Sequence, residues 1–271
     1  MVEGVSRLAT MFAEATDRGG AAFLPYMTAG LPTLAGSPSM FEALAEAGAD
    51  GFEVGIPYSD PLMDGPVIQE AGARSLAAGT TLDGALGVVR TVVAETGKPV
   101  IVMSYVNPIL RRGIDRFCAQ VAEAGGSGVI VPDVPADEAG ELLEATNLYR
   151  LGLALFAAPT TDDARLTDIA AAEPSFVYGV ADLGVTGERR EASTRIEGLA
   201  ARVRAATEAP LVLGVGISTP EQAAAAARFA DGVIVGSALV RVVLDADTPE
   251  AATAALGGLA SSLAEAIHDV S

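Results

Sequence analysis

The chain has 271 residues, half of them hydrophobic and 19% charged, which is enough apolar material for one large core and argues against disorder. Its formal charge of −18 and its sequence pI near 4.3 would repel nucleic-acid backbones and anionic lipid surfaces. We therefore expect a protein that binds neither nucleic acid nor membranes. An anionic small molecule is not excluded, because backbone amides at helix N-termini carry partial positive charge that a count of Lys and Arg misses.

Eight short runs rich in Val, Ile, Leu and Phe recur along the chain, each followed by a loop and an Ala- and Glu-rich stretch of helical period. We expect strands at Phe23–Thr28, Gly51–Ile56, Pro99–Ser104, Gly128–Val131, Leu153–Ala157, Phe176–Val180, Leu211–Val215 and Gly232–Val235. Intervening stretches such as Met40–Ala47, Ile114–Ala124 and Ala164–Ala172 carry apolar residues on one face, as helices packed on a sheet do. Eight alternating strand and helix units predict an α/β fold, the closed (β/α)8 TIM barrel.

An extra helix around Ser6–Ala15 precedes the first strand, where it would plug the bottom of the barrel, and a terminal helix at Pro249–His268 closes the chain. The Pro- and Gly-rich pieces Leu31–Pro38 and Pro57–Pro66 have the lengths of elaborated loops. Because the sequence contains no linker, low-complexity tract or charge block, we expect a single domain over residues 1–271. The alternative is an open doubly wound sheet, which would have fewer strands and a Gly-rich dinucleotide turn that does not open this chain.

The inventory of reactive side chains is narrow. The single histidine, His268, lies near the end of the terminal helix, far in sequence from the strand ends where barrel active sites are built, which argues against a Ser-His-Asp triad and a His-ligated zinc site. Cys118, the single cysteine, fits a small core residue better than a nucleophile, and no disulfide can form within the chain. No secretory leader opens the sequence, so we expect a cytoplasmic protein without a metal, whose acid-base chemistry falls to carboxylates, Tyr or Lys.

The segment GFEVGIPYSDPLMDGP, residues 51–66, places carboxylates where a barrel would use them. The bulky residues of its strand alternate with Gly51, Glu53 and Gly55, so Glu53 points toward the barrel axis if the bulky residues pack on the helices. A carboxyl group there is poorly solvated, which raises its pKa and suits it to donate and accept protons near neutrality. The alternative is a carboxylate that reaches water or pairs with a core Lys or Arg. With Asp64 in the following loop, Glu53 forms a two-carboxylate hypothesis.

Glycine-rich loops follow the last three predicted strands. Residues Gly214 to Ser218 end the seventh strand, Gly236 and Ser237 end the eighth just before a helix, and Gly184 to Gly187 follow the sixth. Barrels commonly bind phosphate at the loops after strands seven and eight, through backbone amides and a helix N-terminus. A tight turn explains any one of these glycine pairs equally well, but three such loops together predict a phosphate site.

These segments, taken together and in order, resemble the tryptophan synthase alpha chain family from about Phe23 to Val240. The resemblance is carried by Glu53 to Leu62, Asp64 to Pro66, Tyr105 to Pro108, Val131 to Pro135, Gly184 to Gly187, Gly214 to Ser218, and Gly236 with Ser237. It implies retro-aldol cleavage of indole-3-glycerol phosphate to indole and glyceraldehyde 3-phosphate, without metal or organic cofactor. It also implies a pyridoxal-phosphate beta chain that receives the indole within an alpha2beta2 complex.

The resemblance assigns roles to residues of this sequence. Glu53 corresponds to the family's acid-base residue, and Asp64 to the carboxylate that polarises the indole N–H. The residues expected to line the indole cleft, each of which could equally be core packing, are Tyr26, Met103, Ile130, Ala157 and Tyr178. Those expected to bind phosphate are Gly187, Gly216, Gly236 and Ser237. Those expected to face the beta chain are Pro57 and Asp60.

Some positions depart from the family pattern. Phe52 and Met63 replace smaller aliphatic residues beside the carboxylates, Ala181 and Asp182 replace a Ser-Arg pair, and the loop Thr33–Ser39 is enlarged. The altered loops leave two alternatives open, a stand-alone lyase that releases free indole and a weakly catalytic barrel that acts by binding a beta chain. Another phosphate-binding barrel, an isomerase or a prenyl-glyceryl phosphate synthase, would share the glycine loops but lack the carboxylate loop.

Overall fold

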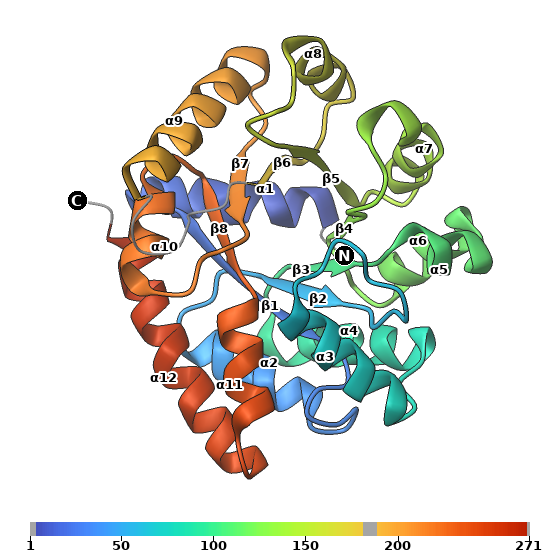
Figure 1. The fold of residues 1–271 in the computed structure, drawn as a ribbon. Helices are drawn as coiled ribbons and strands as arrows, with labels where there is room; N and C mark the ends of the chain where they lie inside the picture. Colours follow the sequence, from blue (N-terminus) through green and yellow to red (C-terminus); the bar gives the residue numbers. More distant parts are fainter. Residues whose placement is uncertain (1–3, 181–188, 270–271) are drawn as a thin grey trace.

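The structure, a computed structural model, describes residues 4–180 and 189–269, and for 189–193 the backbone alone. Within these ranges eight parallel strands form a closed barrel in which each strand pairs with the next and β8 pairs with β1 (Figure 1). The strands are β1 (Ala22–Thr28), β2 (Phe52–Gly55), β3 (Val100–Met103), β4 (Gly128–Ile130), β5 (Gly152–Ala157), β6 (Phe176–Val180), β7 (Leu211–Gly214) and β8 (Gly232–Val235). The predicted barrel is confirmed, and every predicted strand boundary lies within one residue of the observed one.

Helices cover the barrel, and all of them except α1 belong to its outer layer (Figure 1). They are α1 (Gly4–Asp17), α2 (Ser37–Glu46), α3 (Pro66–Ala77), α4 (Leu82–Thr96), α5 (Val106–Arg112), α6 (Ile114–Glu123), the 3-10 turn η1 (Ala136–Glu138), α7 (Gly140–Leu148), α8 (Asp163–Ala171), α9 (Arg189–Ala206), α10 (Pro220–Ala227), α11 (Ser237–Asp245) and α12 (Pro249–His268). The terminal helix has its predicted bounds. The helix expected at Met40–Ala47 begins earlier, at Ser37, because Pro38 in its first turn has a fixed φ that suits a helix start.

The N-terminal helix α1 lies across the barrel instead of joining the outer ring (Figure 1). Its side chains Leu8 and Met11 fill the space left by glycines at the strand starts. A methyl group on Gly51 would lie 2.8 Å from the sulfur of Met11, and one on Gly152 would lie 2.7 Å from Leu8. These contacts place α1 at the amino ends of the strands, as the sequence predicted, and the opposite mouth remains for the site.

The outward faces of the strands bury bulky side chains against the helices. Phe52 of β2 is fully buried and packs edge-on against Phe41 of α2, with ring centroids 5.4 Å apart. Phe52, one of the residues that depart from the family pattern, therefore lies in the layer between strands and helices. Its neighbour Glu53 points to the interior, because side chains alternate along β2. Among the described residues no single helix is long and apolar enough to cross a bilayer. The pair α3 and α4 has the length and composition for it only when taken together, and the two helices are bent by 106° relative to each other.

His268 takes part in a polar contact away from the mouth of the barrel. Its Nε2 lies 2.8 Å from Asp50, whose carboxylate also accepts hydrogen bonds from Arg18 at 3.0 Å and from the Phe23 N–H at 2.8 Å. These contacts lower the pKa of Asp50, against the opposing effect of its burial. They tie α12 to the end of α1 and the start of β1, so the histidine has a structural role here and stands apart from the mouth.

Candidate functional site

A cavity of about 760 Å³ opens at the carboxyl ends of the strands. Its walls come from the ends of the strands and from the loops after β2, β4, β5, β7 and β8, and they are mainly apolar. This is where barrel enzymes build their sites, because the βα loops converge there on a rigid ring of strands. Most of the predicted site residues line this one cavity: Tyr26, Glu53, Asp64, Met103, Ile130, Ala157, Tyr178, Gly216, Gly236 and Ser237.

Glu53 projects into the barrel from the middle of β2, as the alternation of its strand predicted. It lies beside Tyr26 in the pairing of β1 with β2, and its side chain is 4% exposed. Gly55, two residues on, leaves room for the ring of Tyr26, since a methyl group there would lie 2.1 Å from the tyrosine hydroxyl. The Tyr26 hydroxyl is satisfied within the chain by Thr28 at 3.2 Å. Glu53 is therefore a cavity residue and not a strand-end carboxylate that reaches bulk water.

One oxygen of the Glu53 carboxyl, Oε2, is buried without a hydrogen-bond partner among the described residues. Burial, together with the nearby Asp64 carboxylate, raises the pKa of Glu53 to about 8. No Lys or Arg of the described residues pairs with it in an ion bridge, so the core ion-pair alternative is not what the structure shows. An unpaired buried acceptor that faces a cavity is the arrangement expected of a group reserved for a ligand.

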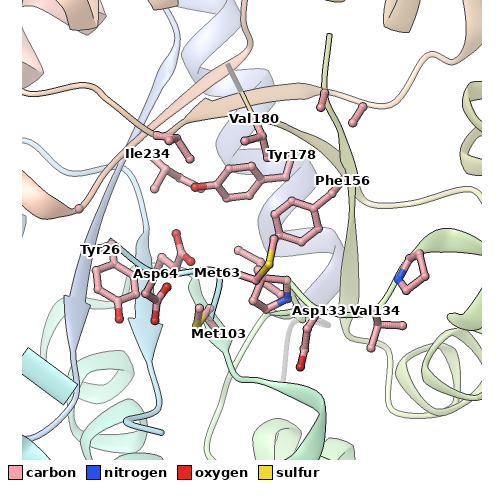
Figure 2. Close-up of a pocket in the computed structure, with 18 of the residues that line it drawn as sticks. Tyr26, Met63, Asp64, Met103, Asp133, Val134, Phe156, Tyr178, Val180 and Ile234 are labelled. Atoms are coloured by element: carbon pink, nitrogen blue, oxygen red, sulfur yellow. The ribbon is translucent and has the colours of Figure 1, made fainter. Parts of the chain in front are cut away.

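Asp64 reaches the same cavity from the loop between β2 and α3 (Figure 2). Its backbone is held on both sides: its N–H donates to Pro61 O at 3.1 Å, and its carbonyl accepts from Gln69 Nε2 at 2.9 Å. Burial raises the pKa of Asp64 to about 6, while hydrogen bonding by Tyr105 acts in the opposite direction. The pKa values of the two carboxyls thus lie on either side of neutral pH. Near pH 7 Glu53 is mainly protonated and Asp64 mainly ionised, which is the pattern of an acid paired with a charge stabiliser.

Aromatic rings form the apolar part of the cavity (Figure 2). Tyr178 stacks on Phe156 with ring centroids 4.8 Å apart and an interplanar angle of 25°. Gly214 on the next strand leaves room for Tyr178, because a methyl group there would lie 2.1 Å from its hydroxyl oxygen. Phe156 was missed by the sequence analysis. Its strand was recognised, but the pairing of Phe156 with Tyr178 across β5 and β6 is set by the register, which no local pattern displays.

The predicted phosphate residues of β7 and β8 converge on one side of the cavity. Val215 and Gly216 have φ angles of 80° and 74°, so the chain turns sharply after β7. A β-branched residue in this region is a strained exception, of a kind that concentrates at functional sites. Gly236 caps α11, which begins at Ser237, so the positive end of that helix faces the cavity. Gly187 lies outside the described residues, as do Ala181 and Asp182.

The rim of the cavity is acidic and adds residues that the sequence analysis did not assign. Asp133, Asp137 and Asp168 line it, and Arg165 is the one basic side chain among the lining residues described. Met63, the second departure from the family pattern, lines the cavity while 65% of it remains exposed. This rim would repel an anion, whereas the loops after β7 and β8 offer backbone amides and the N-terminal end of α11.

Two residues predicted to face a partner lie on the loop that follows β2. Asp60 is exposed and accepts a hydrogen bond from Ser59 at 2.6 Å, whereas Pro57 is buried in this chain. Leu62, between them and Asp64, is 89% exposed.

Cys118 is buried in α6, where burial raises the pKa of its thiol to about 12. Within residues 4–180 and 189–269, no three His, Cys, Asp or Glu side chains are grouped so that they could hold a metal ion.

Comparisons with known proteins agree with this geometry. A family model described as tryptophan synthase alpha chain matches residues 12–268. The tryptophan synthase alpha chain of Salinispora tropica is 45% identical over 264 residues, 97% of this chain and 98% of the relative, and that of Streptomyces avermitilis is 43% identical over 261 residues, 96% and 94%. Among solved structures, tryptophan synthase subunit alpha from Legionella pneumophila superposes with a TM-score of 0.88 at 34% identity, over 98% of this chain and 99% of that one. A chain of Mycobacterium tuberculosis tryptophan synthase superposes with a TM-score of 0.86 at 37% identity, over 97% and 98%.

Proposed function

Because the chain belongs to the tryptophan synthase alpha chain family, we infer that its cavity binds indole-3-glycerol phosphate and cleaves it to indole and glyceraldehyde 3-phosphate. The family membership confirms the resemblance that the sequence motifs carried. It makes the chain a carbon–carbon lyase of tryptophan biosynthesis. The roles of individual residues are our proposal, and they rest on the geometry of the cavity.

Glu53 supplies both proton transfers in this proposal. The protonated carboxyl first donates its proton to ring carbon C3, which bears the glycerol chain. The resulting carboxylate then removes the proton from the hydroxyl on the adjoining glycerol carbon. The bond between that carbon and C3 breaks, its electron pair returns to the ring, and the carbon becomes the aldehyde. Glu53 ends protonated, as it began, which is consistent with its pKa of about 8.

Asp64 stabilises the charge that appears when C3 is protonated. That charge is shared with the ring nitrogen, whose N–H becomes a stronger hydrogen-bond donor. A carboxylate that is ionised near neutral pH accepts from that N–H and lowers the energy of the cationic ring, most effectively in a cavity with few water molecules. The reaction draws on two side chains for acid, base and charge stabilisation, so it calls for neither a metal nor an organic cofactor.

The phosphate binds, in this proposal, to the loops after β7 and β8. Gly216, Gly236 and Ser237 contribute backbone amides and a hydroxyl, and α11 adds the positive end of its dipole. This explains how an anion can bind to a chain of formal charge −18. The apolar ring of the substrate would lie against Tyr178 and Phe156, within reach of Glu53 and Asp64 and apart from the phosphate loops.

The observation that carries this proposal is the buried, unpartnered carboxyl oxygen of Glu53, which faces an apolar cavity beside a second carboxylate. The direct test is release of indole from indole-3-glycerol phosphate by the purified chain. Glu53→Gln should reduce the rate by at least about a thousandfold, since it removes both proton transfers. Glu141→Gln, on the exposed face of α7, is the matched control and should cleave at the wild-type rate. Equal rates for wild type and Glu53→Gln would refute the mechanism.

We further propose that the chain works with a tryptophan synthase beta chain in an alpha2beta2 complex, as the relatives' description as alpha chains suggests. The exposed part of the β2–α3 loop, with Asp60 and Leu62, offers polar and apolar contacts to such a partner. Pro57, being buried, would set the course of that loop without touching the partner.

A titration with a beta chain separates this arrangement from its alternatives. Indole release that rises on adding the beta chain, together with a complex in gel filtration, supports the subunit role. A brisk rate that the beta chain leaves unchanged, without a complex, identifies a stand-alone lyase, and a complex without cleavage identifies a binding subunit. The cytoplasmic location expected from the sequence stays a prediction.

A further inference from the structure

Tyr105 connects the loop that carries Asp64 to the neighbouring strand. It follows Ser104, the first residue after β3, and immediately precedes α5. Its ring is buried. Its hydroxyl accepts a hydrogen bond from the N–H of Met63 at 3.1 Å. This bond holds the peptide unit between Leu62 and Met63, one residue before Asp64, and so limits the movement of the loop that carries Asp64.

The position of the Tyr105 ring is itself fixed from two further sides. Tyr58 packs against it with ring centroids 5.2 Å apart, and the Tyr58 hydroxyl accepts from Asn107 Nδ2 at 3.0 Å. The next residue along, Val106, donates its N–H to Asp133 at 2.9 Å. Three loops, those after β2, β3 and β4, are thereby joined around one phenol, which is the kind of support that holds a reactive group in place.

The hydroxyl of Tyr105 has one proton and two lone pairs. Because it accepts from Met63, its proton remains available to the Asp64 carboxylate. Burial is the largest cause that raises the pKa of both groups; hydrogen bonding by Tyr105 opposes it at Asp64, and the charge of Asp64 adds to it at Tyr105. The other titratable groups near Asp64 are Glu53 of β2, Tyr26 of β1 and Tyr178 of β6, and the pKa of each is raised first by burial and then by neighbouring negative charge.

We propose that Tyr105 is a positioning residue of the reaction, which holds the loop of Asp64 so that this carboxylate can accept from the ring N–H of the substrate. This inference rests on the function proposed above. Without the phenol, Asp64 would keep the burial that favours its neutral form and lose the hydrogen bond that opposes it. A neutral Asp64 could no longer stabilise a cationic ring.

The substitution Tyr105→Phe tests this, because it removes the hydroxyl and keeps the ring that packs on Tyr58. The measurement is kcat/KM for cleavage of indole-3-glycerol phosphate across the pH range 5 to 9, which in the wild type should fall off on the acid side near the pKa of Asp64, about 6. In Tyr105→Phe the acid limb should move up by about one pH unit, which is a tenfold loss of rate below pH 6 and a smaller loss near pH 8. Tyr58→Phe is the matched control, since it keeps the Tyr105 hydroxyl, and its acid limb should stay in place.

The outcomes separate this inference from the proposed function. If the wild type cleaves the substrate, Asp64→Asn removes the acid limb and Tyr105→Phe leaves that limb where it was, the positioning role is refuted and the function stands. If the wild type does not cleave the substrate, the proposed function fails first. A ¹³C titration of the Asp64 carboxyl in the ligand-free chain gives a second readout, made on variants whose circular dichroism and unfolding midpoint match the wild type. The pKa of Asp64 should be higher in Tyr105→Phe than in the wild type, and equal values would overturn the inference whatever the activity of the variant.

Discussion

Replacing Glu53 by Gln should stabilise the fold while it abolishes catalysis. The buried carboxyl has a pKa of about 8 in the folded chain, against an ordinary value of 4.5. Between those two values the folded state holds a proton that the unfolded state releases, so the stability of the wild type falls as the pH rises through this window. The amide of Gln does not ionise, so the variant does not lose this stability.

The size of the effect follows from the shift. Each pKa unit corresponds to about 1.4 kcal/mol, so the advantage of Glu53→Gln should grow from under about 1 kcal/mol at pH 5 to about 3 kcal/mol at pH 7 and about 5 kcal/mol above pH 8. These are upper values, because the Gln amide still needs hydrogen-bond partners in the same place. For a domain of this size, about 3 kcal/mol raises the unfolding midpoint by roughly 6 to 12 °C.

Urea and thermal unfolding at pH 5, 6, 7 and 8 measure this directly, with Glu141→Gln as the control that should show no pH-dependent difference from the wild type. A difference between Glu53→Gln and the wild type that stays the same at every pH would mean that Glu53 titrates normally in the folded chain. Lower stability of the variant at pH 8 would refute the claim that its carboxyl is buried without a partner.

Two further substitutions test the walls of the cavity. Gly214→Ala places a methyl group 2.1 Å from the Tyr178 hydroxyl, so the ring must move by over about 1 Å. We expect kcat/KM for cleavage to fall by about tenfold or more and the free energy of unfolding to drop by about 1–3 kcal/mol. Wild-type values in both assays would contradict the described packing. Ser237→Asp places a carboxylate at the start of α11, where it should repel the substrate phosphate. We expect KM to rise at least about tenfold, with a smaller change in kcat. An unchanged KM in steady-state kinetics would show that Ser237 is not part of the phosphate site.

Two unusual groups lie at the mouth of this barrel. Val215 has a φ angle of 80° within the predicted phosphate loop, and one carboxyl oxygen of Glu53 is buried without a partner among the described residues. At the opposite end, α1 fills the strand-start space with Leu8 and Met11, and Asp50 is fully engaged by its neighbours. The division fits an enzyme in which the amino ends of the strands supply stability and the carboxyl ends supply chemistry.

The order of elements could be predicted from the sequence because it depends on local patterns. Apolar runs separated by helical periods located all eight strands, and alternation along β2 was enough to send Glu53 inward and Phe52 outward. The glycine loops after β7 and β8 were recognised for the same reason, since glycine marks a turn from its own backbone preference. Among the helices whose bounds were predicted, one boundary differs by more than two residues. It is the start of α2 at Ser37, which precedes the predicted start at Met40 because Pro38 was assigned to the loop.

Contacts between distant segments were decided by the tertiary structure alone. Tyr105 reaches Met63 across 42 positions of sequence, and Phe156 meets Tyr178 through the pairing of β5 with β6. The local sequence does not indicate the role of either residue. An aromatic residue near a strand end gives the same sequence pattern whether its ring packs in the core or lines a cavity. The raised pKa of Glu53 depends likewise on its burial inside the closed barrel and on the Asp64 carboxylate, which a separate loop brings to the same cavity. The sequence by itself determined which chemical groups are present and which way their strands direct them, whereas the closure of the barrel decided which groups meet, and with that their charge states.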